Sequence, residues 1–407
     1  MKRILTNIAM RKMAFSLIGV VASFSLHAYD LEQDGLGYTI LPDRDHCVEV
    51  SYAEKTVLYL SIPSTVTIND CDYTVVSIGK SAFSCRASLR RLELPSTLET
   101  IGSQGLYGVW NLDYVKIPDN VTTMDYCSTA DGGYYSLIIP DKIEMINGFF
   151  DNCRNLHTIV LGKGVKGIKN FAFNDLKVLR EMYVLCPDVP ALSDYPFWRC
   201  DSPDAIIYVP KEALDKYRGI KNQSQNLDAS IKREPTGYHP EPTEADATWS
   251  YFHDFRPIPD LFMVTGREDY VKGPGNRDFL RCDVVNYAGV EILSDKWVYD
   301  PEIVSIDGDI FTALAPGKTT MKRVIETSSG TFESHEITLT VIKPDPSGVE
   351  LPVAEPAEPV SMPANAMSGT VEYFTIDGMS AGSDPDRLAR GIYIERDHGK
   401  TRKFIKR

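Results

Sequence analysis

One spacing recurs along the first half of this chain and constrains its fold more than any other feature. An apolar residue followed by proline recurs at steps of 23 and 22 residues, and the next step of 22 residues carries glycine in place of proline. Two other apolar series run in phase with this one. The three series are Leu94-Pro95, Ile117-Pro118, Ile139-Pro140 and Leu161-Gly162; Ile78, Ile101, Met124, Ile146 and Ile168; and Leu98, Val121, Ile143 and Val165. A shared period of about 20 to 29 residues is typical of a solenoid of stacked repeats.

Each repeat also contains a short alternating segment. Leu92 and Leu94 are separated by one residue, and proline follows the segment. Alternation predicts a β-strand with one buried face, and proline ends the strand because it has no N–H group to donate. The chain is therefore predicted to be mainly β, with a leucine-rich repeat solenoid of 22–23-residue repeats. The copy that contains Asp131-Gly132-Gly133 is predicted to be a looser turn, because it lacks the usual core residues.

Local motifs within the repeats point to a family. A leucine strand that ends in proline is followed by an Ile78-Gly79 turn, and Phe150-Asp-Asn-Cys153-Arg-Asn-Leu156 gives a Phe-x-x-Cys-x-x-Leu element. In these features the repeats resemble the BspA-type leucine-rich repeat. Ile207-Tyr208-Val209-Pro210 and Tyr217 resemble the terminal segment of that family, so the likeness covers about residues 40–220. The resemblance implies a bacterial surface adhesin that engages host matrix proteins or other bacteria.

The region after the repeats alternates in short segments as well, which predicts a β-sandwich. It contains Trp297, a Pro301-x-x-Val304 turn and an Ala313-x-x-x-Gly317 element. In these features it resembles the group 2 bacterial immunoglobulin-like domain. The sequence Asp307-Gly308-Asp309 in this region is compatible with a calcium ligand, although such a pair of acids beside glycine is more often a turn.

The last forty residues contain strand-like sequence at 371–378 and 391–394 and end in a basic run from Lys400 to Arg407. They resemble the C-terminal sorting signal of the type IX secretion route. A small β-hairpin tail with a solvated basic end explains the same residues equally well.

These observations divide the chain into seven parts. We predict a signal peptide at 1–28, an N-terminal β cap at 29–57, and the solenoid with its C-terminal cap at 58–220. A linker at 221–245 precedes an immunoglobulin-like β-sandwich at 246–343, a Pro-rich linker at 344–367 and a C-terminal β or sorting-like segment at 368–407.

The N-terminus and the net charge restrict location and partners. Four basic residues precede or enter an apolar run from Met13 to Leu26 that closes at Ala28, as in a secretory signal peptide. Removal of residues 1–28 leaves 39 basic and 56 acidic residues, so the net charge falls from −13 to −17. Nucleic acid is not expected as a partner, because its binding depends on Lys and Arg. No second run of about 18 apolar residues follows, so we expect an exported protein without a membrane span in the mature chain.

Eight cysteines follow the leader, and an even number in an exported protein permits disulfides. None of them forms a C-x-x-C pair, so the spacing gives no metal signature. Cys153 occupies a repeat position that points into the solenoid and is predicted to be a small buried hydrophobe. The pairs Cys186 with Cys200 and Cys47 with Cys71 are possible bridges.

The search for catalytic motifs gave no candidate residue. The histidines outside the leader are widely spaced, and the sequence lacks the G-x-S-x-G, G-x-x-x-x-G-K and G-x-G-x-x-G motifs. We therefore predict no catalytic residue, no cofactor and no metal. A pair of acids for glycoside hydrolysis can be formed by the fold alone, so the alternative is an extracellular carbohydrate-processing or peptidase component with an unrecognised active site.

Recognition is the function that the repeats favour. Along each predicted strand, the residues between the buried leucines face outward on one continuous sheet, which predicts a ligand-binding face. We expect this face to bind a host matrix protein, another cell-surface protein or a glycan outside the cell, and we expect a monomer. The candidate ligand-binding residues are Arg91, Glu93, Tyr114, Lys116, Ser136, Ile138, Thr158, Val160, Glu181 and Tyr183.

Overall fold

The fold is described from a computed structural model. It describes residues 29–193, 195–219 and 249–343, and, of the C-terminal residues, four strands. The chain divides into one unit that ends at Pro257 and a second that begins at Ile258. The leader predicted at 1–28 and the linkers predicted at 221–245 and 344–367 lie outside the described residues.

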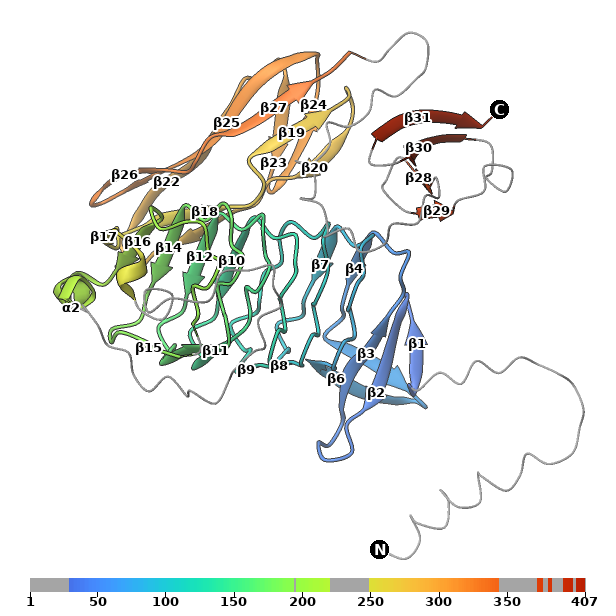
Figure 1. The fold of residues 1–407 in the computed structure, drawn as a ribbon, viewed down its shortest axis with the longest axis horizontal. Helices are drawn as coiled ribbons and strands as arrows, with labels where there is room; N and C mark the ends of the chain where they lie inside the picture. The colour runs from blue at the N-terminus through green and yellow to red at the C-terminus, as the bar shows by residue number, and fades with distance from the viewer. Residues whose placement is uncertain are drawn as a thin grey trace, which may run out of the picture. The chain divides into compact units, whose positions relative to one another are not determined.

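Parallel strands from successive repeats form one wall of the first unit (Figure 1). Neighbouring strands are in register one repeat apart, so that Ser136 pairs with Thr158 and Thr158 pairs with Glu181. This register confirms the predicted period, because each coil pairs with the equivalent segment of the next coil. The strands are β10 (Ser136–Ile139), β12 (Thr158–Leu161), β14 (Glu181–Val184), β16 (Ile206–Val209) and β17 (Asp254–Pro257).

Shorter parallel strands form the opposite wall of the coils (Figure 1). The apolar series that begins at Ile78 lies on these strands and is buried from Ile78 to Ile168. One sheet contains β6 (Cys71–Ile78), β8 (Thr100–Ile101) and β9 (Thr123–Met124), and another contains β11 (Met145–Asn147), β13 (Gly167–Lys169) and β15 (Ala191–Leu192). A separate parallel pair joins β4 (Tyr59–Ser61) to β7 (Arg91–Glu93).

Aromatic side chains fill the turns that connect the two walls. Phe150, Phe173 and Phe197 are fully buried and form a column, with ring centroids 5.3 Å apart at both steps. Cys153 is also fully buried, which confirms that it serves as a small core residue. Each coil therefore covers the apolar side of the next, which is how a solenoid builds a continuous core.

The repeat that contains Gly132 and Gly133 differs from the predicted looser turn. Both glycines and Tyr134 are buried. A side chain at Gly133 would meet the backbone carbonyl of Trp110, and one at Gly132 would meet the ring of Tyr134. Gly133 is required by close packing against the preceding coil and Gly132 by packing within its own coil, so the turn is tight.

An N-terminal β cap covers the first coil. β1 (Leu31–Gln33), β2 (Leu36–Ile40) and β3 (Cys47–Ala53) pair in an antiparallel manner, and β3 then pairs in parallel with β6. β5 (Thr65–Ile68) pairs with the other edge of β6. The cap buries apolar side chains such as Leu36 and Val48, so the core of the first coil is not left open.

The C-terminal end of the solenoid includes residues that we had placed in the second domain. The short helices η1 (Lys211–Ala213) and α2 (Leu214–Gly219) follow β16, and η3 (Trp249–Tyr251) precedes β17. Trp249, Phe252 and Phe255 belong to the same buried cluster as the repeats. The predicted boundary at residue 246 therefore differs from the structure, in which residues 249–257 complete the solenoid because their aromatic side chains cap its core.

The second unit consists of short strands. One sheet runs β19 (Asp269–Lys272), β27 (Ile337–Val341), β25 (Gly317–Thr327) and β22 (Ile292–Val298), with β26 (Gly330–Glu333) also paired to β25. A second sheet runs β20 (Arg277–Phe279), β24 (Ile310–Ala313) and β23 (Val304–Asp307), and β18 (Phe262–Thr265) pairs with β21 (Cys282–Val285). Phe311, Leu339 and Met321 are among the fully buried residues of its core.

The C-terminal strands form a four-stranded antiparallel sheet in the order β29 (Ser380–Gly382), β28 (Glu372–Thr375), β30 (Gly391–Asp397) and β31 (Lys400–Lys406). β28 covers residues 372–375 of the first segment that is predicted to be strand-like, and β30 covers all of the second, 391–394. The basic run is part of β31. Its role as a sorting signal stays a prediction.

All eight cysteines are free in the structure, so neither of the two possible bridges is formed there. Cys47 is in register with Thr74, which places Cys71 about 10 Å further along the strand at roughly 3.3 Å per residue. A bridge requires Cα atoms less than about 7 Å apart. The thiol of Cys186 donates instead to the carbonyl oxygen of Gly162 at 3.3 Å, and Cys200 is buried beside Tyr251.

Candidate functional site

The outer face of the solenoid wall is the side of β4, β7, β10, β12, β14, β16 and β17 that points away from the core. On the inner side, Leu137, Ile159 and Met182 are buried in the solenoid core. Strand alternation places two columns of residues on the outer face. The register aligns Ser136, Thr158, Glu181, Ile206 and Asp254 in one column, and Ile138, Val160, Tyr183, Tyr208 and Arg256 in the other.

The structure aligns six of the ten predicted site residues, those on β10, β12 and β14, and exposes only some of the ten. Of the ten, Glu93 and Lys116 are exposed, and Arg91, Ile138 and Glu181 are half-buried. The prediction that all ten face solvent is wrong for Tyr114, Ser136, Thr158, Val160 and Tyr183, which are buried. Alternation tells on which side of a strand a residue lies, but not what else covers that side. Ligand binding by any of the ten stays a prediction.

The predicted continuous sheet is also interrupted. Residues 112–118, which include Tyr114 and Lys116, form no strand. β7 pairs with β4, and the wall resumes at β10. The outer face therefore has two separate strand-built ends.

Both ends contain residues that the sequence analysis did not identify. At the N-terminal end, Tyr59 and Ser61 align with Arg91 and Glu93, and the side chain of Tyr59 is 60% exposed. At the C-terminal end the additional residues are Ile206, Tyr208, Asp254 and Arg256. The alternation around Ile207 in the sequence was sufficient to find Ile206 and Tyr208. The short segment Asp254-Phe255-Arg256-Pro257 repeats the pattern of a strand that ends in proline.

Aromatic stacking and charge pairing organise the C-terminal end. The rings of Tyr183 and Tyr208 stack with centroids 4.5 Å apart, and the hydroxyl of Tyr183 donates to Glu181 Oε2 at 3.3 Å. The guanidinium of Arg256 donates from Nε to both carboxylate oxygens of Asp254 at 3.1 Å and from Nη2 to Oδ2 at 2.6 Å. Burial raises the pKa of Tyr208 above its ordinary value, and the negative charge of Glu181 raises it further. Its phenol therefore stays protonated at neutral pH and can donate a hydrogen bond.

Arg91 and Glu93 form an ion pair at the N-terminal end, next to the exposed ring of Tyr59. Tyrosine and arginine are the residue types that most often dominate binding interfaces. The two ends of the outer face therefore share the chemistry of a protein contact.

The described parts of the chain contain no cluster of His, Cys, Asp and Glu that could hold a metal ion. His253 lies 3.2 Å from Asp204, and both side chains are mostly exposed. His157 stacks on Tyr135 with ring centroids 5.4 Å apart. Neither histidine is presented to a nucleophile in the contacts that the structure describes.

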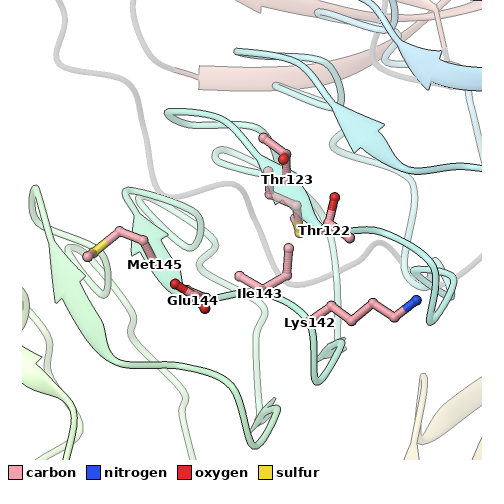
Figure 2. Close-up of a pocket in the computed structure, with 7 residues that line it drawn as sticks. Thr122, Thr123, Lys142, Ile143, Glu144 and Met145 are labelled. Carbon is pink, nitrogen blue, oxygen red and sulfur yellow. The ribbon is translucent and has the colours of Figure 1, made fainter.

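An open groove of about 400 Å³ lies on the opposite wall of the solenoid. Figure 2 shows its lining, with Thr122 and Thr123 from one coil and residues 142–145 from the next. The groove marks a break in the wall. The backbone N–H of Thr122 donates to the carbonyl oxygen of Glu99 in the preceding coil, and the N–H of Lys166 donates to the carbonyl oxygen of Glu144. Among the described coils, no equivalent backbone bond joins residue 144 to residue 122. Its charged groups already have partners, since Lys142 bonds Asn120 at 3.0 Å and Glu144 bonds Lys166 at 2.6 Å.

The comparisons with known proteins agree with the repeats. Residues 76–204 match the BspA type leucine rich repeat region in six copies. The search of curated proteins found no match. No helix in the described portion of the chain is long and apolar enough to cross a membrane.

The solved structures to which the chain is similar include leucine-rich repeat proteins. A leucine-rich repeat protein of T. pallidum is 20% identical, with 48% of this chain and 97% of that chain covered and a TM-score of 0.40. One from Bacteroides ovatus is 19% identical, with 45% and 65% covered and a TM-score of 0.29. A leucine rich cell surface protein of Faecalibacterium prausnitzii is 22% identical, with 42% and 50% covered and a TM-score of 0.32.

Proposed function

We propose, from the BspA-type repeats at residues 76–204 and the geometry of the outer face, that this chain is an exported, adhesin-like binding protein without catalytic activity. Its ligand is a protein outside the cell. The observation that carries the proposal is that each of the two strand-built ends of the outer face aligns accessible aromatic and charged side chains in register. Tyr59, Arg91 and Glu93 are at one end, and Tyr208, Asp254 and Arg256 are at the other.

The shape of this face favours a protein over a small molecule. Five strands about 4.8 Å apart span roughly 20 Å, which suits one modest protein contact. The face is built from strand side chains, and two grooves of about 400 Å³ lie elsewhere, at 122–145 and in the second unit. Fixed aromatic rings and paired charges lose little conformational freedom on binding, so they make efficient contact residues.

Other parts of the chain have supporting roles in this proposal. The second unit, which resembles the group 2 bacterial immunoglobulin-like domain, acts as a spacer that holds the solenoid away from the cell. The C-terminal sheet serves in export or surface attachment. The mature protein acts at the cell surface or in the medium.

A panel experiment separates binding from catalysis. Full-length mature protein is passed over immobilised fibronectin, laminin and collagen, and it is also incubated with generic glycosidase and protease substrates. The proposal expects saturable binding to at least one matrix protein and no turnover of any substrate. Turnover that is lost when a pair of acidic residues is replaced would instead establish the carbohydrate-processing or peptidase alternative.

A further inference from the structure

A second groove, also of about 400 Å³, lies entirely within the second unit. Its lining comes from β22, the end of β23, the β23–β24 turn and β25, and comprises Asp295, Trp297, Tyr299, Ile306, Gly308, Asp309 and Arg323. We propose that this groove binds a neutral pyranose sugar, with Trp297 and Tyr299 as its apolar floor and Asp309 and Arg323 as its polar rim. The site is separate from the outer face of the solenoid and goes beyond the function proposed for it.

The floor of the groove is aromatic. Trp297 lies on β22 and Tyr299 follows the last residue of that strand, and both line the groove. Both are half-buried and pack against the core of the unit, and Ile306 from β23 packs beside them. Their positions are therefore fixed by packing, while part of each ring stays accessible. The C–H face of a pyranose ring is apolar and packs well on flat aromatic surfaces of this kind.

The rim offers a fixed donor. Arg323 donates from Nε and Nη2 to the two oxygens of Asp295 at 2.9 and 2.6 Å, and from Nη1 to the carbonyl oxygen of Cys282 at 2.6 Å. These bonds hold the planar guanidinium still, and a guanidinium has five N–H groups, so donors remain after three bonds. A fixed donor can bond a sugar hydroxyl with little loss of freedom.

The rim also offers a free acceptor. The carboxylate of Asp309 has no hydrogen-bond or ion-pair partner among the residues that the structure describes. It is exposed at the tip of the β23–β24 turn, where Gly308 has a φ of 58° and adds no side chain. A carboxylate accepts hydrogen bonds from hydroxyl groups and gains more from them than a neutral acceptor does.

The combination of groups favours a sugar over two other ligands. A cationic side chain would be attracted by the aromatic rings and Asp309, but Asp295 is already neutralised by Arg323, whose positive charge faces the same groove. Calcium requires six to eight oxygen ligands, and no metal-binding cluster occurs in the described residues of this unit. A sugar hydroxyl both donates and accepts, so it uses Arg323 and Asp309 together. The volume also lies within the roughly 300 to 1,000 Å³ of small-molecule sites.

The test uses full-length mature protein and the methyl glycosides of glucose, galactose, mannose and N-acetylglucosamine. Saturation-transfer NMR detects contact with the sugar protons, and a titration gives the dissociation constant. At least one glycoside is expected to bind, and Asp309→Asn is expected to weaken it by about tenfold, the loss typical of a hydrogen bond to a charged group. Asp307→Asn is the matched control, because Asp307 is exposed at the end of β23, next to the turn, but does not line the groove.

Two results would overturn the proposal. One is the absence of binding by the unaltered protein for all four glycosides at concentrations on the order of tens of millimolar. The other is binding that Asp309→Asn and Asp307→Asn affect equally. Since both aspartates are exposed, neither variant depends on the core of the unit, and thermal unfolding checks that each is folded. Binding to matrix proteins is measured separately, so failure here leaves the solenoid proposal untouched.

Discussion

Tyr208 stacks on Tyr183 from the neighbouring coil, with ring centroids 4.5 Å apart and ring planes only 8° apart. The parallel register places the two residues directly opposite each other on the outer face. Tyr183 is buried, with Tyr208 covering one face of its ring, while Tyr208 is half-buried and has Arg256 beside it. The buried ring of Tyr183 thus holds the accessible ring of Tyr208 in place.

Tyr208→Ala is expected to weaken binding of the retained matrix protein by about tenfold or more, because a fixed aromatic residue at an interface commonly contributes 2 kcal/mol or more. Surface plasmon resonance with the full chain measures the effect. Tyr126→Ala is the control, since Tyr126 is 42% exposed and lies outside the outer face. Equal loss in both variants would show that the C-terminal end of the outer face is not the contact.

Gly162 occupies the position at which three earlier repeats have proline. A Cβ atom there would lie 2.5 Å from both the carbonyl carbon and oxygen of Pro140, which are backbone atoms that cannot move aside. Gly162→Ala is therefore expected to lower the free energy of unfolding by about 1 to 3 kcal/mol. Gly167→Ala is the matched control, because a Cβ there meets only the flexible end of Met145. Urea unfolding compares the two, and similar midpoints would contradict the close approach of the coils.

Asp175 is a buried carboxylate surrounded by cations. Arg154 Nη2 lies 2.8 Å from Oδ2, and Lys177 Nζ and Arg199 Nη2 lie 3.0 and 3.3 Å from Oδ1. Burial alone would raise the pKa of Asp175, but Lys177, Arg199 and Arg154 outweigh it, so the pKa lies below the ordinary value of 3.8. A lowered folded-state pKa means that the stabilisation is fully present above pH 3.8 and is lost as the pH falls through the folded-state value.

Asp175→Asn is expected to destabilise the solenoid by roughly 2 to 3 kcal/mol near pH 7, since three cations lose a buried partner. Asparagine tolerates the positive φ of 61° at this position, so the change isolates the charge. The difference in the free energy of unfolding between Asp175→Asn and the unaltered protein should become smaller below about pH 3.8. Asp201→Asn, which removes a mostly exposed partner of Lys177, should cost at most about 1 kcal/mol. A pH-independent deficit for Asp175→Asn would contradict the role of its charge.

The free thiols differ in accessibility and therefore in reactivity. Burial raises the pKa of Cys186 to about 12, of Cys200 to about 11 and of Cys282 to about 12, whereas Cys71 and Cys85 are exposed. Iodoacetamide at pH 8 should modify Cys71 and Cys85 first, because the thiolate is the reactive form. Peptide mass mapping of the native protein gives the order. A peptide that links Cys186 to Cys200 would show that the mature protein is oxidised instead.

The spacing of apolar residues was sufficient to predict the solenoid, because the stacking of coils requires that spacing. Each coil must bury its apolar side and pair its backbone with the next coil, so equivalent residues recur at the same step. Leu137 and Ile159 therefore appear in the sequence at the distance at which they align in the sheet. β17 lies outside this regular spacing, because it is reached by chain that does not repeat, and only its short strand pattern before Pro257 marks it in the sequence.

The burial of the outer face could not be predicted from alternation. Alternation correctly placed Val160 and Tyr183 on the side opposite Ile159 and Met182, and the register confirms that alignment. Whether such a side chain is exposed depends on neighbours that are distant in the sequence, such as Tyr208 over Tyr183. The groove of the second unit was missed for the same reason, because Asp309 and Trp297 come from different sheets and meet only in the folded unit.

Hydrogen–deuterium exchange of the full chain, with and without the matrix protein retained in the panel, tests the central claim most directly. The account predicts slower exchange on binding in Tyr59–Ser61, Ile206–Val209 and Asp254–Pro257, which are the strands at the two ends of the outer face. Unchanged exchange in all three strands, with protection confined to residues 122–145 or to the second unit, would contradict it.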